Sequence, residues 1–245
     1  MPHFTTLQGR NLAYHKTPGS GPGVVFLGGY KSDMEGSKAT HLEDWCRAQG
    51  RAYLRFDYSG HGQSAGAFED GCIGDWRDDA LAMIEALSEG PQILVGSSIG
   101  GLIALLIARD HPDLVAGLVT IAAAPDFATT KWDSLTDDEK HVVETRGYHQ
   151  EPSDYGEDYI FTKRLFEDGV HQRVLTDKLH LPFPTRMLQG TEDNAVSPET
   201  ATQLLHHAEC NDMRLTLVKG KDHSFSDPES LGILEAAIAD VISQN

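Results

Sequence analysis

Positive charge is scarce in this sequence of 245 residues, which has 20 lysines and arginines against 37 aspartates and glutamates. The formal net charge of −17 repels nucleic-acid phosphates, so we expect no nucleic-acid partner. A membrane-spanning helix needs roughly 18 apolar residues, and the longest apolar run here is GLIALLIA at 101–108. The opening residues MPHFTTLQGR also lack the basic start and apolar stretch of a secretory leader. We therefore expect a cytoplasmic protein with no membrane span.

Cysteine is equally scarce, and no group of histidines has metal-ligand spacing. Cys46, Cys72 and Cys210 are few, odd in number and without motif spacing, so we expect three reduced thiols and no disulfide framework. Of the 12 histidines, His206 and His207 are adjacent on a predicted helix and cannot share one face of it. The sequence therefore predicts neither a metal site nor a cofactor.

Six short apolar runs predict buried strands, and helical patterns alternate with them. The strands lie at 24–29, 52–60, 90–98, 114–123, 184–190 and 213–220, and the helices at 37–50, 73–90, 101–112, 197–209 and 229–243. Near-continuous apolar strands are typical of a parallel sheet covered on both faces. Alternation of strands and helices gives right-handed crossovers. We therefore expect an α/β fold, with one mostly parallel, doubly wound sheet and a single domain over 1–245.

One long segment, from 126 to about 183, interrupts this alternation. It is charged and aromatic and contains helical patches at 138–147 and 157–169, but no convincing strand. We interpret it as a short helical lid inserted over the end of the sheet where α/β proteins bind ligands. Its apolar side chains either line an acyl pocket or simply pack on the sheet; they are Phe127, Trp132, Tyr159, Phe161, Leu165 and Phe166.

The pentapeptide Gly-Ser-Ser-Ile-Gly at 96–100 follows a predicted strand and opens a predicted helix. A nucleophilic serine is typically held on such a sharp strand-to-helix turn, with small residues two positions before and after it. The helix N-terminus then directs free N–H groups at the reacting centre. This pattern predicts that Ser98 is the nucleophile, and that Ser97, in the variable position, faces elsewhere.

A nucleophilic serine needs a base, and the base needs an orienting acid. In the order Ser, Asp or Glu, His, the acid follows a later strand and the histidine follows the last strand. Asp193 lies in the loop after the strand at 184–190, with Glu192 as the weaker alternative. His223 lies in the loop after the strand at 213–220 and is the predicted general base.

Backbone N–H groups are the expected donors to a developing oxyanion. One belongs to Ile99, the residue after the predicted nucleophile. The second should come from the loop after an early strand, where Gly28 and Gly29 allow a sharp turn and Tyr30 follows. We predict Tyr30 N–H and Ile99 N–H as the oxyanion hole.

With these motifs the sequence resembles the α/β-hydrolase superfamily of serine hydrolases. The stretches at 27–39, 55–64 and 90–101 are most similar to its mitochondrial palmitoyl-protein thioesterases, which are also acyl-glucuronide esterases. The resemblance implies a triad of Ser98, His223 and Asp193 without metal or organic cofactor. It also implies ester or thioester substrates, either small molecules or acylated proteins. We expect a monomer or small homo-oligomer.

Several alternatives stay open. Gly60, Gly62 and Gly66 partly match a dinucleotide-binding fingerprint, but no helix follows at once, so we interpret 58–72 as a surface loop near the site. The same triad also serves perhydrolases of the haloperoxidase type and peptidases. A non-catalytic ligand-binding module on a hydrolase fold is the alternative outside the enzymes.

Overall fold

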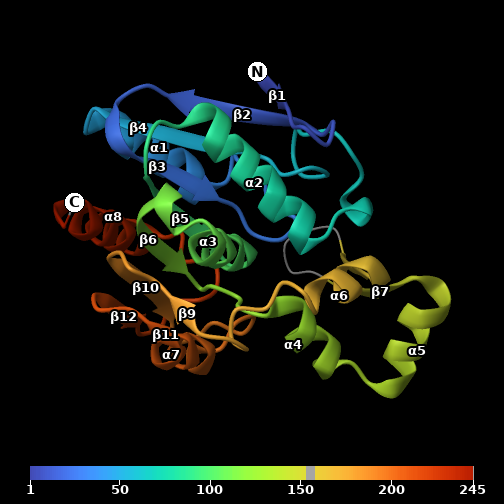
Figure 1. The fold of residues 1–245 in the computed structure, drawn as a ribbon. Helices are drawn as coiled ribbons and strands as arrows, with labels where there is room; N and C mark the ends of the chain where they lie inside the picture. The colour runs from blue at the N-terminus through green and yellow to red at the C-terminus, as the bar shows by residue number, and fades with distance from the viewer. Residues whose placement is uncertain (153–157, 245) are drawn as a thin grey trace.

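The computed structural model describes residues 1–152 and 158–244 and contains an eight-stranded sheet (Figure 1). The strands run in the order β1 (His3–Thr5), β2 (Asn11–Thr17), β4 (Arg51–Phe56), β3 (Ser20–Leu27), β5 (Gln92–Ser97), β6 (Val115–Ile121), β10 (Thr185–Gly190) and β12 (Met213–Val218). The six from β4 to β12 pair in parallel, and all six match the predicted strands. The α/β fold with a mostly parallel sheet is therefore confirmed.

The antiparallel pair β1–β2 at one edge of the sheet was not predicted. β1 has only three residues, and β2 carries an exposed or half-buried polar residue at most positions. The edge strand β1 is too short, and polar residues interrupt the buried ones in β2, so neither strand is a continuous apolar run in the sequence. The pattern used for the central strands therefore could not find them.

Helices cover both faces of the sheet, as the alternating pattern predicts. One face packs against α2 (Ile73–Leu87), α3 (Ile99–Asp110) and α7 (Pro198–His207), and the other against α1 (Ser37–Ala48) and α8 (Pro228–Ser243). Side chains alternate along β3: Val25 and Leu27 enter the core beside α2 and α3, whereas Val24 and Phe26 enter the core beside α1 and α8.

The segment 126–183 follows β6 and extends from one end of the sheet (Figure 1). It contains α4 (Phe127–Ser134), α5 (Asp137–Arg146), β7 (Tyr148–Glu151), β8 (Tyr159–Thr162), α6 (Lys163–Gly169) and β9 (Leu179–His180), which pairs with β11 (Ala208–Glu209). The expectation of a purely helical segment was wrong, because β7 and β8 form an antiparallel pair. Aromatic and β-branched residues fill β8 and favour a strand, and the helix predicted from 157 begins only at Lys163. The start of that predicted helix, residue 157, lies outside the described residues.

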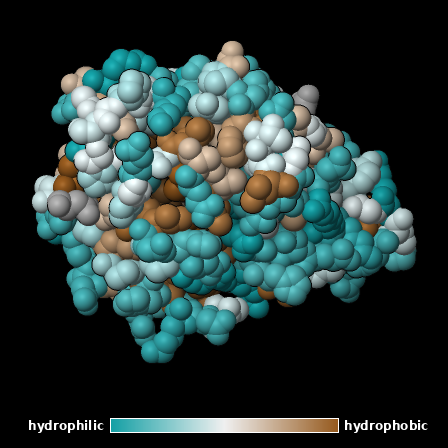
Figure 2. Space-filling model, turned by 45° about the horizontal axis from the view of Figure 1, so that its top comes forward, coloured by the Kyte–Doolittle hydropathy of each residue, from teal (hydrophilic) through white to brown (hydrophobic). Residues whose placement is uncertain are grey.

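Most apolar side chains of this segment pack into the core. Phe161, Leu165 and Phe166 are buried in the cluster beside α2 and α3, and Phe127 and Trp132 pack against it. Figure 2 shows a largely hydrophilic face with one hydrophobic patch near its centre. Among the helices of the described residues, none has the length and apolar character needed to cross a bilayer.

The stretch 58–72 is only partly a surface loop. Tyr58 is 2% exposed and His61 is 4% exposed, whereas Gln63 is exposed. The His61 ring lies 5.0 Å from the rings of both Phe68 and Trp76. The aromatic side chains bury this stretch against α2, which the glycine spacing alone did not indicate.

Candidate active site

Ser98 lies at the sharp turn between β5 and α3. Its backbone has φ 56° and ψ −118°, a conformation that non-glycine residues rarely adopt. Its N–H donates to the carbonyl oxygen of Ile121 at 2.9 Å, and its own carbonyl accepts from Ala124 N–H at 3.1 Å. These bonds to the end of β6 and the residues after it hold the strained turn and expose the serine at the carboxyl end of the sheet.

The two glycines that frame this turn are required by close backbone contacts. A Cβ on Gly96 would overlap the backbone of Gly100, and a Cβ on Gly100 would overlap the carbonyl oxygen of Leu27. The spacing in the pentapeptide therefore reflects how tightly β5, α3 and the end of β3 meet.

The structure brings together the three side chains predicted from separate loops. His223 Nε2 lies 3.0 Å from Ser98 Oγ, and His223 Nδ1 lies 2.8 Å from Asp193 Oδ2. Within a Ser–His–Asp arrangement, the carboxylate accepts the Nδ1 proton and leaves Nε2 free to accept from the serine. Glu192 is exposed and its side chain takes no part in this chain of bonds, so the geometry favours Asp193 over the alternative.

Four hydrogen bonds hold the Asp193 carboxylate. Oδ1 accepts from the N–H groups of Ala195 at 2.9 Å and Val196 at 2.8 Å, and Oδ2 accepts from His223 and from Gln189 Nε2 at 2.9 Å. Burial by itself raises the pKa of Asp193, but the bonds from His223 and Val196 outweigh it and hold the pKa below its usual value. Asp193 therefore stays ionised in a buried position.

Gln189 helps to hold the Asp193 carboxylate, which the sequence did not indicate. It is fully buried in β10, and its Nε2 donates to both Asp193 Oδ2 and the Val196 carbonyl oxygen. A single glutamine near the end of an apolar strand matches no sequence motif. Only its hydrogen bond to Asp193 in the structure shows that it holds this carboxylate.

The loop after β3 lies against the serine turn. A Cβ on Gly29 would lie 3.5 Å from the Ser98 Cβ, and both Gly29 and Tyr30 line the same cavity as Ser98 and His223. Within the described ranges, neither Tyr30 N–H nor Ile99 N–H has a hydrogen-bond acceptor. Neither N–H group is therefore occupied by an acceptor from the described residues, which is what the predicted oxyanion hole requires.

The side chain of Tyr30 points away from this loop into the segment 126–183. Its hydroxyl donates to the carbonyl oxygen of Ile160 in β8 at 2.5 Å, and its ring stacks on Phe161 at 5.5 Å. The next residue, Lys31, donates from Nζ to the Asp158 carbonyl oxygen at 2.9 Å. Burial raises the pKa of Tyr30 well above its usual value, so its hydroxyl stays a donor.

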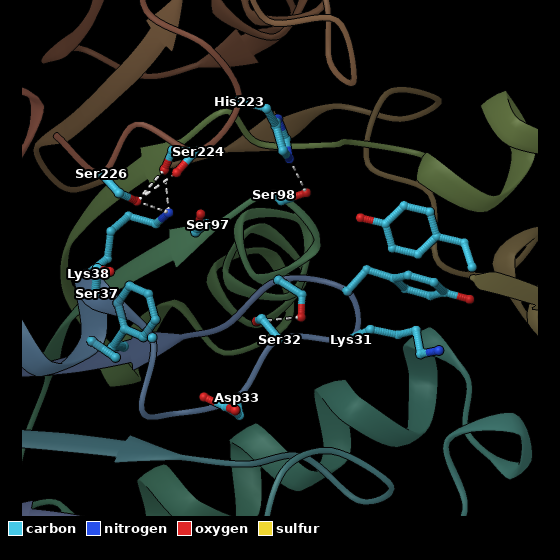
Figure 3. Close-up of a pocket in the computed structure, with 16 residues that line it drawn as sticks. Lys31, Ser32, Asp33, Ser37, Lys38, Ser97, Ser98, His223, Ser224 and Ser226 are labelled. Carbon is cyan, nitrogen blue, oxygen red and sulfur yellow. Dashed lines mark hydrogen bonds between the residues drawn. The ribbon is translucent and has the colours of Figure 1, made fainter. Parts of the chain in front are cut away.

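The cavity beside Ser98 measures about 560 Å³ (Figure 3). Lys31 lies on one side of Ser98, and Lys38, Ser97, Ser224 and Ser226 lie on the other. Tyr30 and Tyr159 also line the cavity. The expectation that Ser97 faces elsewhere was wrong, because Ser97 lines this cavity while being 6% exposed. Alternation along β5 is the reason: Ser97 shares its face with Ile93 and Val95, which is the face toward α1.

Comparisons with known proteins agree with this fold. Residues 37–142 match the family model described as alpha/beta hydrolase fold. The chain is 36% identical over 236 residues to "Palmitoyl-protein thioesterase ABHD10, mitochondrial" of Bos taurus, which covers 96% of this chain and 77% of that protein.

Two solved structures have nearly the same fold. "Alpha/beta hydrolase domain-containing protein 10 from mouse" superposes with a TM-score of 0.93 at 32% identity, covering 99% of this chain and 98% of that one. A hydrolase structure from Agrobacterium vitis S4 also has a TM-score of 0.93, at 39% identity, covering 98% of each chain. The protein is accordingly an enzyme of the hydrolase class, and its chain belongs to the α/β-hydrolase family.

Proposed function

We propose that this enzyme is a serine hydrolase that cleaves carboxylic esters or thioesters through an acyl-enzyme. The observation that carries the proposal is the pair of hydrogen bonds from Ser98 to His223, 3.0 Å, and from His223 to Asp193, 2.8 Å. These bonds join three side chains from separate loops in the order that nucleophilic catalysis requires, and Ser98 and His223 line the cavity.

In the proposed mechanism, His223 takes the proton of Ser98 as the serine oxygen attacks the substrate carbonyl. Tyr30 N–H and Ile99 N–H stabilise the oxyanion of the tetrahedral intermediate. His223 then gives its proton to the leaving alcohol or thiol, and the acyl group stays on Ser98. Water, deprotonated by His223, attacks the acyl-enzyme and releases the acid, while Asp193 keeps the imidazole in the correct tautomer.

The substrate class rests on the relatives. The curated relatives are named palmitoyl-protein thioesterases, and the resemblance noted above adds acyl glucuronides. We propose an acylated protein or small acyl ester or thioester as substrate, with 126–183 acting as the lid. Only Tyr159 of the six apolar lid side chains named above lines the cavity, so chain length is the property to measure first. A cytoplasmic location stays a prediction, and the curated relatives are named mitochondrial.

Active-site labelling tests the nucleophile directly. A fluorophosphonate probe should label wild type and Ser97→Ala, and labelling should disappear in Ser98→Ala. Turnover of p-nitrophenyl butyrate should fall by about 10⁴-fold or more in Ser98→Ala. Wild-type turnover in that variant would exclude Ser98 as the nucleophile.

A substrate panel tests the reaction class. Acyl esters and acyl thioesters of 2 to 16 carbons, assayed with the same enzyme, should show multiple turnovers and a preferred chain length. Faster perhydrolysis in hydrogen peroxide, or faster release of an N-terminal amino acid from a peptide amide, would favour the perhydrolase or peptidase alternatives.

A further inference from the structure

One side of the cavity carries several hydroxyl groups and one ammonium group. Lys38, Ser97, Ser224 and Ser226 gather there in Figure 3, on the side of Ser98 opposite Lys31. These four residues, called the Lys38 subsite below, come from α1, the end of β5 and the loop that carries His223. None of them has a part in the mechanism proposed above, so their polarity needs another explanation.

The Lys38 ammonium is only partly satisfied by the protein. Its Nζ donates to the Ser224 carbonyl oxygen at 2.5 Å and to Ser226 Oγ at 3.3 Å. An ammonium has three protons to donate, which leaves one available toward the cavity. No carboxylate of the described residues lies within ion-pair distance of Nζ.

The charge of Lys38 is poorly solvated. Burial lowers the pKa of Lys38 to about 8, while the negative charge of Asp222 acts in the opposite direction. Oδ1 of Asp222 is already engaged, since it accepts the N–H groups of Ser224 at 3.0 Å and Phe225 at 3.3 Å. Lys38 also lies in the first turn of α1, which contains no acidic residue and whose N-terminal end adds positive potential. An anion that binds here would stabilise the Lys38 ammonium group in place of the water that burial has removed from it.

Ser97 supplies a second, independent donor. It is 6% exposed, lines the cavity, and its hydroxyl has no hydrogen-bond partner in the part of the chain that the structure describes. Among the described residues, the Ser97 hydroxyl oxygen is not one of the fully buried atoms without a partner, so it is open to the cavity. It lies beside Lys38 in Figure 3, so one acceptor in the cavity can reach both groups. One ammonium proton and one hydroxyl together match the two oxygens of a carboxylate.

We propose that the Lys38 subsite binds a carboxylate carried by the leaving alcohol or thiol of the substrate. This inference rests on the proposed serine hydrolase function. The leaving group must be next to its proton donor, His223, and Ser224 and Ser226 belong to the same loop as His223. The protein as a whole carries a net charge of −17, which repels anions. The positive charge of Lys38 therefore favours an anionic leaving group at this end of the cavity.

Matched substrates test the proposal. The butyryl ester of 3-(hydroxymethyl)benzoate carries a carboxylate on its leaving alcohol, and the butyryl ester of 3-(hydroxymethyl)benzamide is its neutral isostere. Wild type at pH 7 should prefer the charged ester in kcat/KM. Lys38→Gln keeps an N–H donor for the Ser224 carbonyl but loses the charge. It should lower kcat/KM for the charged ester by about tenfold or more and leave the neutral ester nearly unchanged.

Two further variants separate binding of the anion from a structural role. Lys38→Arg should retain the preference for the charged ester, and Ser97→Ala should reduce it by a smaller factor through KM. If Lys38→Gln lowers kcat/KM for both esters equally, Lys38 only holds the His223 loop and the proposal is overturned. If wild type cleaves neither ester, or if Ser98→Ala cleaves both, the serine hydrolase assignment itself has failed instead.

Discussion

Tyr30 of the oxyanion loop donates its hydroxyl to the carbonyl oxygen of Ile160, 130 residues later in the chain, at 2.5 Å. The same residue carries the backbone N–H proposed to stabilise the oxyanion, so one residue links that donor to β8. Lys31 makes a second bond of this kind, to the Asp158 carbonyl oxygen. The position of the segment 126–183 and the position of the oxyanion donor are therefore mechanically connected.

Replacing Tyr30 by Phe keeps the backbone N–H and the ring but removes the bond to Ile160. We expect the free energy of unfolding to fall by about 1 kcal/mol, the usual net contribution of one hydrogen bond. Activity should fall as well, but by less than the roughly 100-fold cost of losing an oxyanion donor. Urea denaturation and ester hydrolysis measure the two effects.

Tyr159→Phe is the matched control, because Tyr159 lines the same cavity and its hydroxyl has no hydrogen-bond partner among the described residues. Tyr159→Phe should leave both the free energy of unfolding and the rate of ester hydrolysis nearly unchanged. Equal effects of the two substitutions would mean that the bond from Tyr30 to Ile160 does not position the loop.

Asp193→Asn tests the orientation of His223. An amide at this position can donate to Nδ1, which stabilises the wrong imidazole tautomer, so kcat should fall by about 10⁴-fold with little loss of stability. Steady-state kinetics checks the first expectation and thermal unfolding the second. Glu192→Gln, one residue earlier in an exposed position, should keep wild-type activity; a large loss there would support the alternative acid.

Gly100→Ala tests the close packing behind the nucleophile. Its Cβ would overlap the Leu27 carbonyl oxygen, which is backbone and cannot move aside freely. We expect the free energy of unfolding to fall by about 1–3 kcal/mol or more, measured by urea denaturation. Gly232 in α8 has open space around it, so Gly232→Ala should instead stabilise by up to about 1 kcal/mol. A harmless Gly100→Ala would contradict the packing argument.

His61 should make stability depend on pH. Burial, with a smaller contribution from the positive charge of Lys31, lowers the pKa of His61 to about 4, against the opposing bond to the Ser59 carbonyl. The unfolded chain, with a histidine pKa of about 6.5, binds more protons than the folded protein between these values. Stability is therefore present above about pH 6.5 and is lost as pH falls toward 4.

His61→Phe removes this titration and keeps a ring beside Phe68 and Trp76. Between pH 6.5 and 4, wild type should lose on the order of 3 kcal/mol more unfolding free energy than the variant. Urea denaturation at several pH values gives the difference directly. Parallel curves for the two proteins would show that His61 does not titrate on unfolding.

The amino-acid sequence is enough to predict the six parallel strands, because strands buried on both faces must be nearly continuous apolar runs. It also predicts the triad of Ser98, Asp193 and His223, since each residue follows its own strand and the residues that form each turn are neighbours in the sequence. It could not indicate β1 and β2, which bury too little, nor β8, where aromatic residues compete with a helical pattern.

Which distant side chains meet depends on how the chain packs in three dimensions. Tyr30 contacts Ile160 across 130 residues, and Lys38 contacts the loop of His223 across 186. No spacing in the sequence predicts such pairs, because they depend on how α1, the insertion and the sheet pack against one another. Short local motifs thus predict the reaction class, whereas the shape and charge of the proposed substrate site arise from packing between distant segments.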